Sequence, residues 1–306
     1  MIDIFIPTYN RPEKLERCLK SIQAEYIDGG GSGGVFVSNN NPDNTRTKEI
    51  CRNYPFVQYY ENEKDLGIDK NHEMVYKYCQ SGYVLLLADD DILLPGSFKV
   101  INEFVSNYDF LFAICNSGEV INDKLNKKPC YDIDSDMVMD TFDAMDFFIY
   151  EKPLKVFPML PYFGGIIINL NSMRLLSKPN ERDLFSGTYH QYIGGLWNAL
   201  LENCLQRDLK VGLIKDVCVA IGCDSDKTWY PYIQAVIDKM NSFYDNLEID
   251  ELRRKHISFL VKYSGRYTHY FYPLAKMIAK KQKRYGKVEN EKKENNGCVR
   301  NTSRSH

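Results

Sequence analysis

Residues 83–91 read Tyr83-Val-Leu-Leu-Leu-Ala-Asp-Asp-Asp91, an apolar run that ends in three carboxylates. The apolar part is short and continuous, which predicts a buried strand. Like charges at close range disfavour joint ionisation unless a cation neutralises them. Mg²⁺ and Mn²⁺ accept carboxylate oxygens and keep open positions for substrate phosphates. The stretch therefore predicts either a metal site at the end of a buried strand or an acidic cap on a surface loop.

Strand and helix patterns alternate on both sides of this stretch. Strands are expected at 2–6, 35–37, 57–60 and 110–115, and helices at 12–23, 45–53, 68–79 and 96–108. The alternation predicts an α/β fold, a Rossmann-like and mostly parallel sheet with helices on both faces. Ligands of such sheets bind beyond the carboxyl ends of the strands. Residues 7–11 and 38–41 are expected to meet the acidic triplet there.

The pattern becomes irregular and acidic after residue 117, which indicates a hairpin or lid region followed by a helix near 141–150. Further strands are expected at 164–169 and 217–222, with a helix at 190–202 between them. Residues 229 to about 285 look helical. The last stretch, 288–306, is polar and poor in apolar residues, which predicts disorder.

Composition narrows the class of protein. The chain has 306 residues, enough for a substantial core, and a net charge of -2, which does not point to nucleic acid. Its nine cysteines include no CxxC pair, which favours buried thiols in a reducing cytoplasm over disulfides or zinc. We expect no signal peptide, and no apolar run approaches the ~18 residues that span a bilayer.

Four segments carry a resemblance to a known family. Residues 4–12, 37–43, 62–71 and 86–91 resemble, in order, the opening signature, the second-strand motif, the "N-x-G…R-N" stretch and the DxD motif of family-two glycosyltransferases with the GT-A fold. Together they cover roughly residues 1–115. The resemblance implies an inverting, metal-dependent transfer of a sugar from a nucleoside-diphosphate donor, with UDP the commonest nucleotide, to a glycan hydroxyl.

The resemblance also implies a nucleotide pocket. Asn39 stands where the family usually has an Asp that contacts the base. An amide both donates and accepts hydrogen bonds, whereas a carboxylate only accepts. The identity of the nucleotide base therefore stays open. Lys70 is either a contact of the diphosphate or ribose or an ordinary solvated lysine. The other residues expected to line the pocket are Pro7, Thr8, Tyr9 and Arg11.

Within the acidic triplet the resemblance assigns different roles. Asp91 matches the last Asp of DxD and is expected to contact the Mn²⁺ or Mg²⁺ ion. Asp89 is expected to reach the ribose or a metal-bound water, and Asp90 to belong to the nucleotide-sugar site. A bound cation would offset the charge that grows on the leaving nucleotide.

Inverting transfer needs a general base for the acceptor hydroxyl. Members of the family that the chain resembles often supply an Asp within a Glu-Asp pair well downstream of DxD, and this sequence has no such pair in that region. Residues 183–192 take the equivalent place. His190 is the first candidate, because an imidazole titrates near working pH, and Asp183 is the alternative. The polar stretch 222–229 either completes the metal or diphosphate site through Asp224, Asp226 or Lys227 or forms a turn and a helix cap.

These inferences divide the chain into a catalytic domain, 1–228, C-terminal helices, 229–287, and a disordered tail, 288–306. The catalytic domain has a nucleotide-sugar-binding half, 1–115, and an acceptor half, 116–228. Aromatic and basic residues in 263–285 suit either a helix on an anionic membrane or a helix packed on the catalytic domain.

The implied acceptor is a glycan, lipid-linked or free, of a bacterial surface polysaccharide such as capsule or O-antigen. The implied location is the cytoplasm, at the inner face of the membrane if the C-terminal helices bind it. Two other functions remain open: a nucleotidyltransferase of sugar phosphates, and a non-catalytic scaffold that binds sugar nucleotides.

Overall fold

The computed structural model describes residues 1–121, 124–140, 143–144, 163–176, 192, 195–196, 199 and 209–222. The chain divides into two compact units, Met1–Asn241 and Ser242–His306, and every described residue belongs to the first. The predicted C-terminal helices at 229–287, the tail at 288–306 and the boundary at residue 228 lie outside the described residues.

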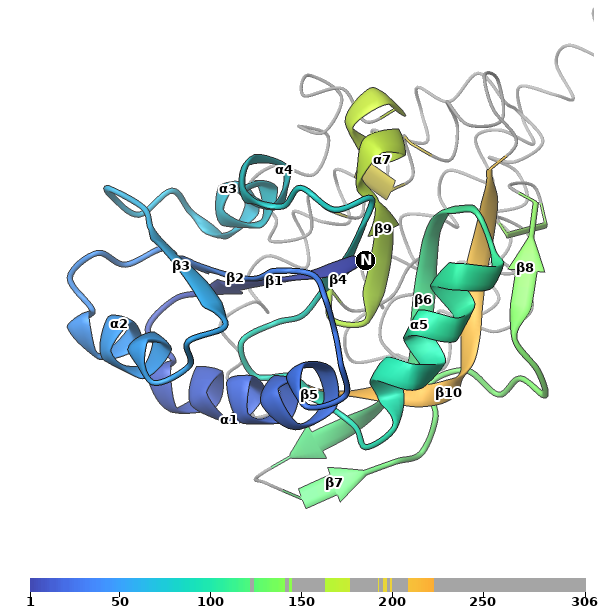
Figure 1. Cartoon of the computed structure of the whole chain (residues 1–306), viewed down its shortest axis with the longest axis horizontal. Coiled ribbons are helices and arrows are strands. Elements are labelled where there is room, and N and C mark those ends of the chain that lie inside the picture. Colours follow the sequence, from blue (N-terminus) through green and yellow to red (C-terminus); the bar gives the residue numbers. More distant parts are fainter. Residues whose placement is uncertain are drawn as a thin grey trace, which may run out of the picture. The chain divides into compact units, whose positions relative to one another are not determined.

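The N-terminal part of the sheet is parallel. Strands β3, β2, β1 and β4 lie side by side in that order, and each pair runs in the same direction. This arrangement confirms the alternation that the sequence predicts (Figure 1). The elements are β1 (Ile2–Thr8), α1 (Pro12–Ile22) with a π-helical turn (Gln23–Ile27), β2 (Val35–Asn39), α2 (Thr45–Arg52), β3 (Val57–Glu61), α3 (Ile68–Glu73), α4 (Val75–Tyr78) and β4 (Tyr83–Leu86).

The sheet continues beyond β4 in the order β9, β6, β10 and β5, with β7 paired to β6 and β8 to β10. Here β10 runs parallel to β6, but β9 is antiparallel to both β4 and β6. The remaining pairings, of β5 and β8 with β10 and of β7 with β6, are antiparallel too. The elements are β5 (Ile92–Leu93), α5 (Ser97–Asn107), β6 (Phe110–Ile121), β7 (Lys124–Asn126), β8 (Met137–Met139), β9 (Ile166–Asn169), α7 (Leu170–Leu176) and β10 (Lys210–Gly222).

The prediction of a mostly parallel sheet is therefore wrong for the second part of the sheet, which is mixed. A fully buried strand such as β9 is a continuous apolar run, and such a run carries no information about strand direction. Two strands are also longer than predicted: β6 continues beyond residue 115 to Ile121, and β10 begins at Lys210, before residue 217.

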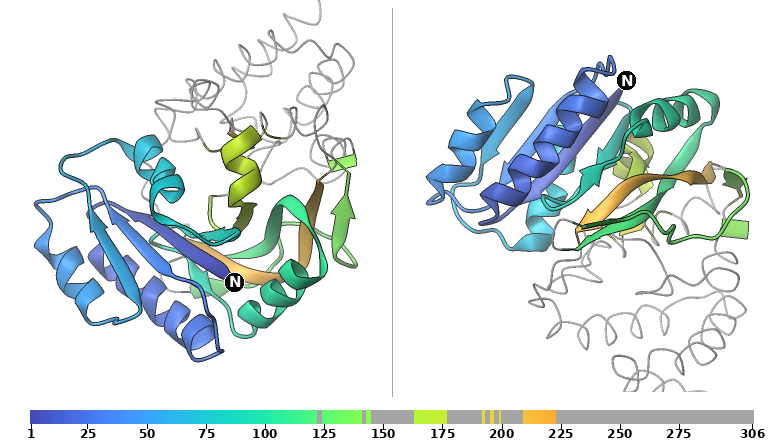
Figure 2. Two further views of the ribbon diagram at one scale, coloured as in Figure 1. Left: turned by 45° about the horizontal axis from the view of Figure 1, so that its top comes forward. Right: turned by 90° about the horizontal axis from the view of Figure 1, so that it is seen from below.

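Helices cover both faces of the sheet, as predicted. Helices α1, α2 and α5 lie on one face, and α3, α4 and α7 lie on the other (Figure 2). Helix α1 buries the face made by Leu15, Cys18, Leu19 and Ile22, the residues whose spacing predicts it.

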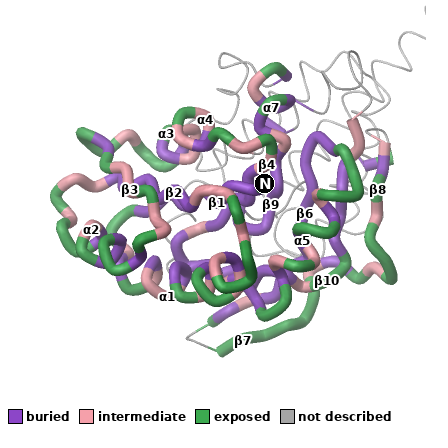
Figure 3. The backbone as a smooth tube through the Cα atoms, viewed as in Figure 1, coloured by how far each residue is buried: buried purple, intermediate pink, exposed green. Residues whose placement is uncertain are grey.

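Strand β1 lies between β2 and β4 and is buried at all seven positions. Figure 3 shows the contrast between this buried centre and the exposed strand β7. The chain leaves β1 after Thr8, so the polar residues of the loop that follows lie at the carboxyl edge of the sheet. In the described part of the chain the cysteines at positions 18, 51, 79, 115 and 218 are free thiols. No helix in the described part of the chain is long and apolar enough to cross a membrane.

Candidate active site

The acidic triplet lies just beyond β4, at the carboxyl edge of the parallel strands. All three aspartates are buried: Asp89 is 4% exposed, Asp90 9% and Asp91 1%. The chain reaches this point because β4 pairs with β1 on one side and with β9 on the other. Three carboxyl groups are therefore held away from bulk water where the two parts of the sheet meet.

Asp89 and Asp90 face the loop that joins β1 to α1. The Thr8 hydroxyl donates a hydrogen bond of 2.8 Å to Asp89. Arg11 Nη1 donates to Asp89 at 3.3 Å and to Asp90 at 3.2 Å, so one guanidinium bridges two carboxylates. Lys14 Nζ lies 3.7 Å from Asp90. Thr8, Arg11, Asp89 and Asp90, all predicted site residues, are thus brought into direct contact.

Helix α1 adds two basic residues that sequence reasoning missed, Lys14 and Arg17. Arg17 Nη2 donates a hydrogen bond of 3.1 Å to the carbonyl oxygen of Asp90. Arg11, Lys14 and Arg17 are spaced three residues apart, which places them along one side of the first helical turns. That spacing is visible in the sequence and is the signal that would have found Lys14 and Arg17.

Asp91 points the other way, into the second part of the sheet. Its carboxylate accepts a hydrogen bond of 2.8 Å from the Ala88 N–H and one of 3.1 Å from the Gly222 N–H at the end of β10. A Cβ at Gly164 would overlap Asp91 Oδ2, so a larger residue there would require the Asp91 carboxylate to move. Asp91 therefore fastens the end of β4 to the end of β10 beside the start of β9.

Burial sets the protonation of the triplet. It raises the pKa of Asp89 to about 6, against the opposing charge of Arg11 and with a further increase from Asp90. Burial also raises the pKa of Asp91 well above its usual range, and the Asp90 charge adds to that effect. Both carboxylates therefore resist ionisation in the protein alone, and a nearby cation would favour their charged forms.

The donor set fits a divalent ion that arrives with a diphosphate. Among the described residues no three His, Cys, Asp or Glu side chains converge into a metal cage, because Asp89 and Asp91 turn in opposite directions. Mg²⁺ at nucleotide sites needs only one or two carboxylates, with phosphate and water oxygens completing its octahedron. The Asp90 side chain, 13% exposed, is the most accessible, compared with 6% for Asp89.

The other predicted pocket residues lie on β1, β2 and α3 or just after β1. Pro7 is buried in β1, and Tyr9 is 46% exposed just after the strand. Asn39 pairs with Thr8 across the β1–β2 ladder and is buried. Its Nδ2 donates to the Asn41 carbonyl at 2.8 Å and to the Tyr59 hydroxyl at 2.9 Å. The amide is therefore held within the protein.

Lys70 lies exposed on α3, and the asparagines around it position that helix. Asn71 exchanges hydrogen bonds with Ser38: the Ser38 hydroxyl donates to Asn71 Oδ1 at 2.6 Å, and Asn71 Nδ2 donates to the Ser38 carbonyl at 3.1 Å. Asn62 Nδ2 donates to Asn71 and Asn40, at 3.0 Å in each case. This buried network ties α3 to the end of β2, so the 62–71 motif has a structural role.

The candidates for the general base, His190 and Asp183, lie outside the described residues, and so do Asp224, Asp226 and Lys227. Their assignments stay predictions.

Comparison with known proteins now identifies the family. The model of the family described as "Glycosyl transferase family 2" matches residues 3–180, more than half of the chain. The chain belongs to this family. The match includes the acidic triplet and every predicted pocket residue, and it ends before His190.

Curated relatives match shorter segments. A processive diacylglycerol beta-glycosyltransferase of Mycoplasma pneumoniae is 27% identical over 122 residues, 38% of this chain and 35% of that protein. The minor teichoic acid biosynthesis protein GgaB of Bacillus subtilis is 22% identical over 145 residues, 44% of this chain and 16% of that protein. This chain therefore spans well under half of the length of these relatives.

Solved structures show the same fold. The crystal structure of S. aureus TarS residues 1–349 matches with a TM-score of 0.57 at 13% identity, covering 86% of this chain and 72% of that one. A structure of the same protein in complex with UDP-GlcNAc matches with a TM-score of 0.54.

Proposed function

We propose that this protein transfers a sugar from a nucleoside-diphosphate sugar, with UDP as the nucleotide, to a hydroxyl group of a glycan. The single observation that carries this proposal is the meeting of Thr8 and Arg11 with Asp89 and Asp90 at the carboxyl edge between β1 and β4. A guanidinium and buried carboxylates at such an edge suit a diphosphate that arrives with a cation.

The nucleotide would bind over the ends of β1 and β2. The exposed ring of Tyr9 offers a stacking surface there, and Lys70 on α3 offers a cation. UDP is favoured because the family match covers this part of the chain and a structural neighbour, TarS, has been crystallised with UDP-GlcNAc. Arg11 would exchange its carboxylate partners for the phosphates when the donor enters.

A divalent ion, Mn²⁺ or Mg²⁺, would be held by Asp91, with the more exposed Asp90 as the alternative ligand. When bound, the ion stabilises negative charge on the leaving diphosphate. Each Asp91 oxygen that accepts a backbone N–H keeps a second lone pair for another partner. Inversion at the anomeric carbon would use His190 as the base that takes the acceptor proton, with Asp183 as its alternative.

The proposed acceptor is a growing bacterial surface polysaccharide, lipid-linked or free. Support comes from the curated relatives, one named for a diacylglycerol beta-glycosyltransferase and one for minor teichoic acid synthesis. Capsule and O-antigen belong to the same class of product. We propose that the reaction takes place in the cytoplasm, and at the inner face of the membrane if the C-terminal helices bind it.

Donor hydrolysis with the full chain tests the function. The protein is incubated with UDP-glucose, UDP-galactose or UDP-GlcNAc, with Mn²⁺, Mg²⁺ or EDTA, and free UDP is measured. Slow, metal-dependent release of UDP supports the transferase. Release of pyrophosphate from UTP and a sugar phosphate would instead indicate a nucleotidyltransferase. Tight UDP binding without turnover of any donor, with every acceptor tried, would indicate a scaffold.

A further inference from the structure

A short loop joins the first strand to the first helix. Strand β1 ends at Thr8 and helix α1 begins at Pro12, so Arg11 lies only three positions beyond the sheet. The backbone turns at Asn10, which has a φ of 56°. Among the residues that the structure describes, it is the only one other than glycine with a positive φ. This turn therefore sets the direction in which the chain enters Arg11.

The left-handed conformation of Asn10 is supported by its side chain. Most residues adopt this conformation at a cost, whereas asparagine adopts it more readily because its short side chain finds local hydrogen bonds. Here Asn10 Oδ1 accepts a hydrogen bond of 2.6 Å from Asn41 Nδ2 and one of 3.0 Å from Asn44 Nδ2. A single oxygen atom therefore joins the loop after β1 to the loop after β2.

Both of these donors are themselves held in place. Asn39 Nδ2, at the end of β2, donates to the Asn41 carbonyl at 2.8 Å, and the Asn41 N–H donates to Asn39 Oδ1 at 3.2 Å. Asn44 is the N-cap of α2, and its Oδ1 accepts a hydrogen bond of 3.2 Å from the Thr47 N–H. Asn10 is thus fastened to the end of one strand and to the start of one helix.

The Arg11 backbone is also held from the other side. Its carbonyl oxygen accepts a hydrogen bond of 3.0 Å from the Leu15 N–H, in the first turn of α1. Pro12 follows it, and the fixed φ of proline suits the first helical position. Arg11 therefore lies between the Asn10 turn and the first turn of α1, and its guanidinium reaches the acidic triplet.

We propose that Asn10 is a positioning residue for the donor, because it holds the Arg11 guanidinium at the edge of the sheet where the diphosphate arrives. The inference rests on the proposed function and adds the residue that prepares the phosphate contact. A guanidinium that is already in place loses less conformational freedom on binding, which raises the affinity. A loop that populates other conformations lowers the observed affinity in proportion.

The test replaces Asn10 in two ways in the full chain. Asn10→Gly keeps the left-handed φ and removes both hydrogen bonds, because glycine adopts this conformation readily. Asn10→Ala removes the same bonds and also disfavours the φ. Asn102→Ala, at an exposed asparagine of α5, is the control. With Mn²⁺ present, calorimetry measures the Kd of UDP, and donor hydrolysis measures KM and kcat.

Asn10→Gly should weaken UDP binding by about 5-fold, the effect of about one net hydrogen bond. Asn10→Ala should weaken it by about 10-fold, the full effect of a guanidinium–phosphate contact. Arg11 would contact the diphosphate both before and during the reaction, so KM should rise with the Kd while kcat changes little. Asn102→Ala should match the wild type. A wild-type Kd in both Asn10 variants would overturn the inference.

A double-mutant cycle separates positioning from a merely structural role. Asn10→Gly is combined with Arg11→Ala, and the Kd of UDP is measured again. If Asn10 acts through Arg11, the double variant binds UDP no more weakly than Arg11→Ala alone. A further loss as large as that of Asn10→Gly in the wild-type background would show that Asn10 acts independently of Arg11, and the inference would then be wrong.

NMR of the Arg11 side chain tests the inference without a ligand. A wild-type protein that neither binds UDP nor hydrolyses a donor would contradict the proposed function. The ¹⁵N relaxation of the Arg11 Nε–H group is then compared between the wild type and Asn10→Gly, both without metal. A more mobile group in the variant supports the positioning role, and equal mobility refutes it.

Discussion

The two parts of the sheet meet at the acidic triplet and hold it by different means. On the parallel side, Asp89 and Asp90 contact the side chains of Thr8, Arg11 and Lys14. On the mixed side, Asp91 contacts the backbone N–H of Gly222 and lies against Gly164.

This difference separates two kinds of function within one short motif. Contacts with charged side chains can exchange for phosphates when a donor binds. Contacts with backbone N–H groups and with glycines are fixed by the fold. We therefore expect the parallel side to govern donor affinity and the mixed side to govern stability and the chemical step.

The largest effect is expected for Asp91→Ala. Turnover should fall by about 10²–10³-fold or more if Asp91 holds the cation, because charge on the leaving diphosphate is then unopposed. Unfolding free energy should also fall, by about 1–3 kcal/mol, because two buried N–H groups lose their acceptor.

Asp90→Ala is the control for stability, and it should lower the free energy of unfolding by at most about 1 kcal/mol. Its partners Arg11 and Lys14 are partly exposed, and such ion pairs contribute little. Donor hydrolysis and urea unfolding measure both variants. If Asp90→Ala instead shows the greater loss of Mn²⁺-dependent turnover, the cation belongs to Asp90.

His190→Ala should lower turnover by about 10²-fold, because the acceptor hydroxyl loses its proton acceptor. The Kd of UDP should stay unchanged, since the parallel side binds the nucleotide. Transfer to an acceptor is measured alongside Asp183→Ala. A normal rate for His190→Ala together with a deficient Asp183→Ala would move the role of base to Asp183.

Gly164→Ala should lower the free energy of unfolding by about 1–3 kcal/mol, because the new methyl group overlaps Asp91 Oδ2. Gly82→Ala is the matched control: nothing lies within 4 Å of the Cβ position at that glycine. Urea midpoints compare the two. Equal midpoints would show that the Asp91 carboxylate moves away without cost.

Arg11→Ala should weaken UDP binding by about 10-fold, because a guanidinium–phosphate contact is lost. Stability should change little, since the Arg11 side chain is 33% exposed. Arg46→Ala is the control, because that arginine pairs with Glu49 on the surface of α2. Calorimetric titration with UDP and Mn²⁺ measures the Kd of UDP for both variants. An unaltered Kd in Arg11→Ala would place the diphosphate away from Arg11.

The last prediction concerns pH. In the folded protein Asp89 keeps its proton up to about pH 6, whereas the unfolded chain releases it near the ordinary value of 3.8. The folded state thus binds more protons between these values, so the free energy of unfolding falls as pH rises through this window. Asp89→Asn should flatten that fall. Urea unfolding of the metal-free protein from pH 4 to 7 measures it, and parallel curves for the two proteins would contradict it.

Local patterns were sufficient for the parallel side because each of its contacts involves a residue type with a recognisable chemistry. The apolar runs gave β1 to β4, and the motifs placed Thr8, Arg11, Asp89 and Asp90 at one edge. Patterns failed for the mixed side because the antiparallel direction of β9 and the extra length of β6 and β10 depend on pairing partners distant in the chain.

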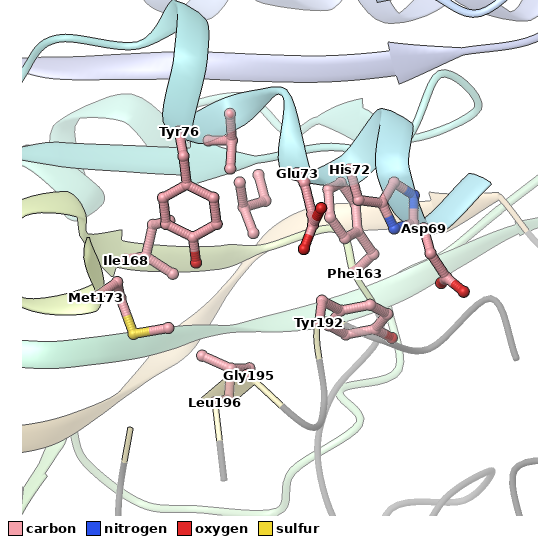
Figure 4. Close-up of a pocket in the computed structure, with 12 residues that line it drawn as sticks. Asp69, His72, Glu73, Tyr76, Phe163, Ile168, Met173, Tyr192, Gly195 and Leu196 are labelled. Atoms are coloured by element: carbon pink, nitrogen blue, oxygen red, sulfur yellow. The ribbon is translucent and has the colours of Figure 1, made fainter. Parts of the chain in front are cut away.

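The sequence by itself determined the family and the alternating strands and helices of the first part of the chain. It also determined that Thr8, Arg11, Asp89 and Asp90 meet at the carboxyl edge of the parallel strands. Repeating apolar spacing and strand-end polar motifs are local, so one chain displays them without its fold. Only the tertiary structure decided that Asp91 faces Gly164 and Gly222 and that His72 of α3 stacks on Phe163 (Figure 4). Those contacts join residues up to 131 positions apart, and only packing brings such residues together.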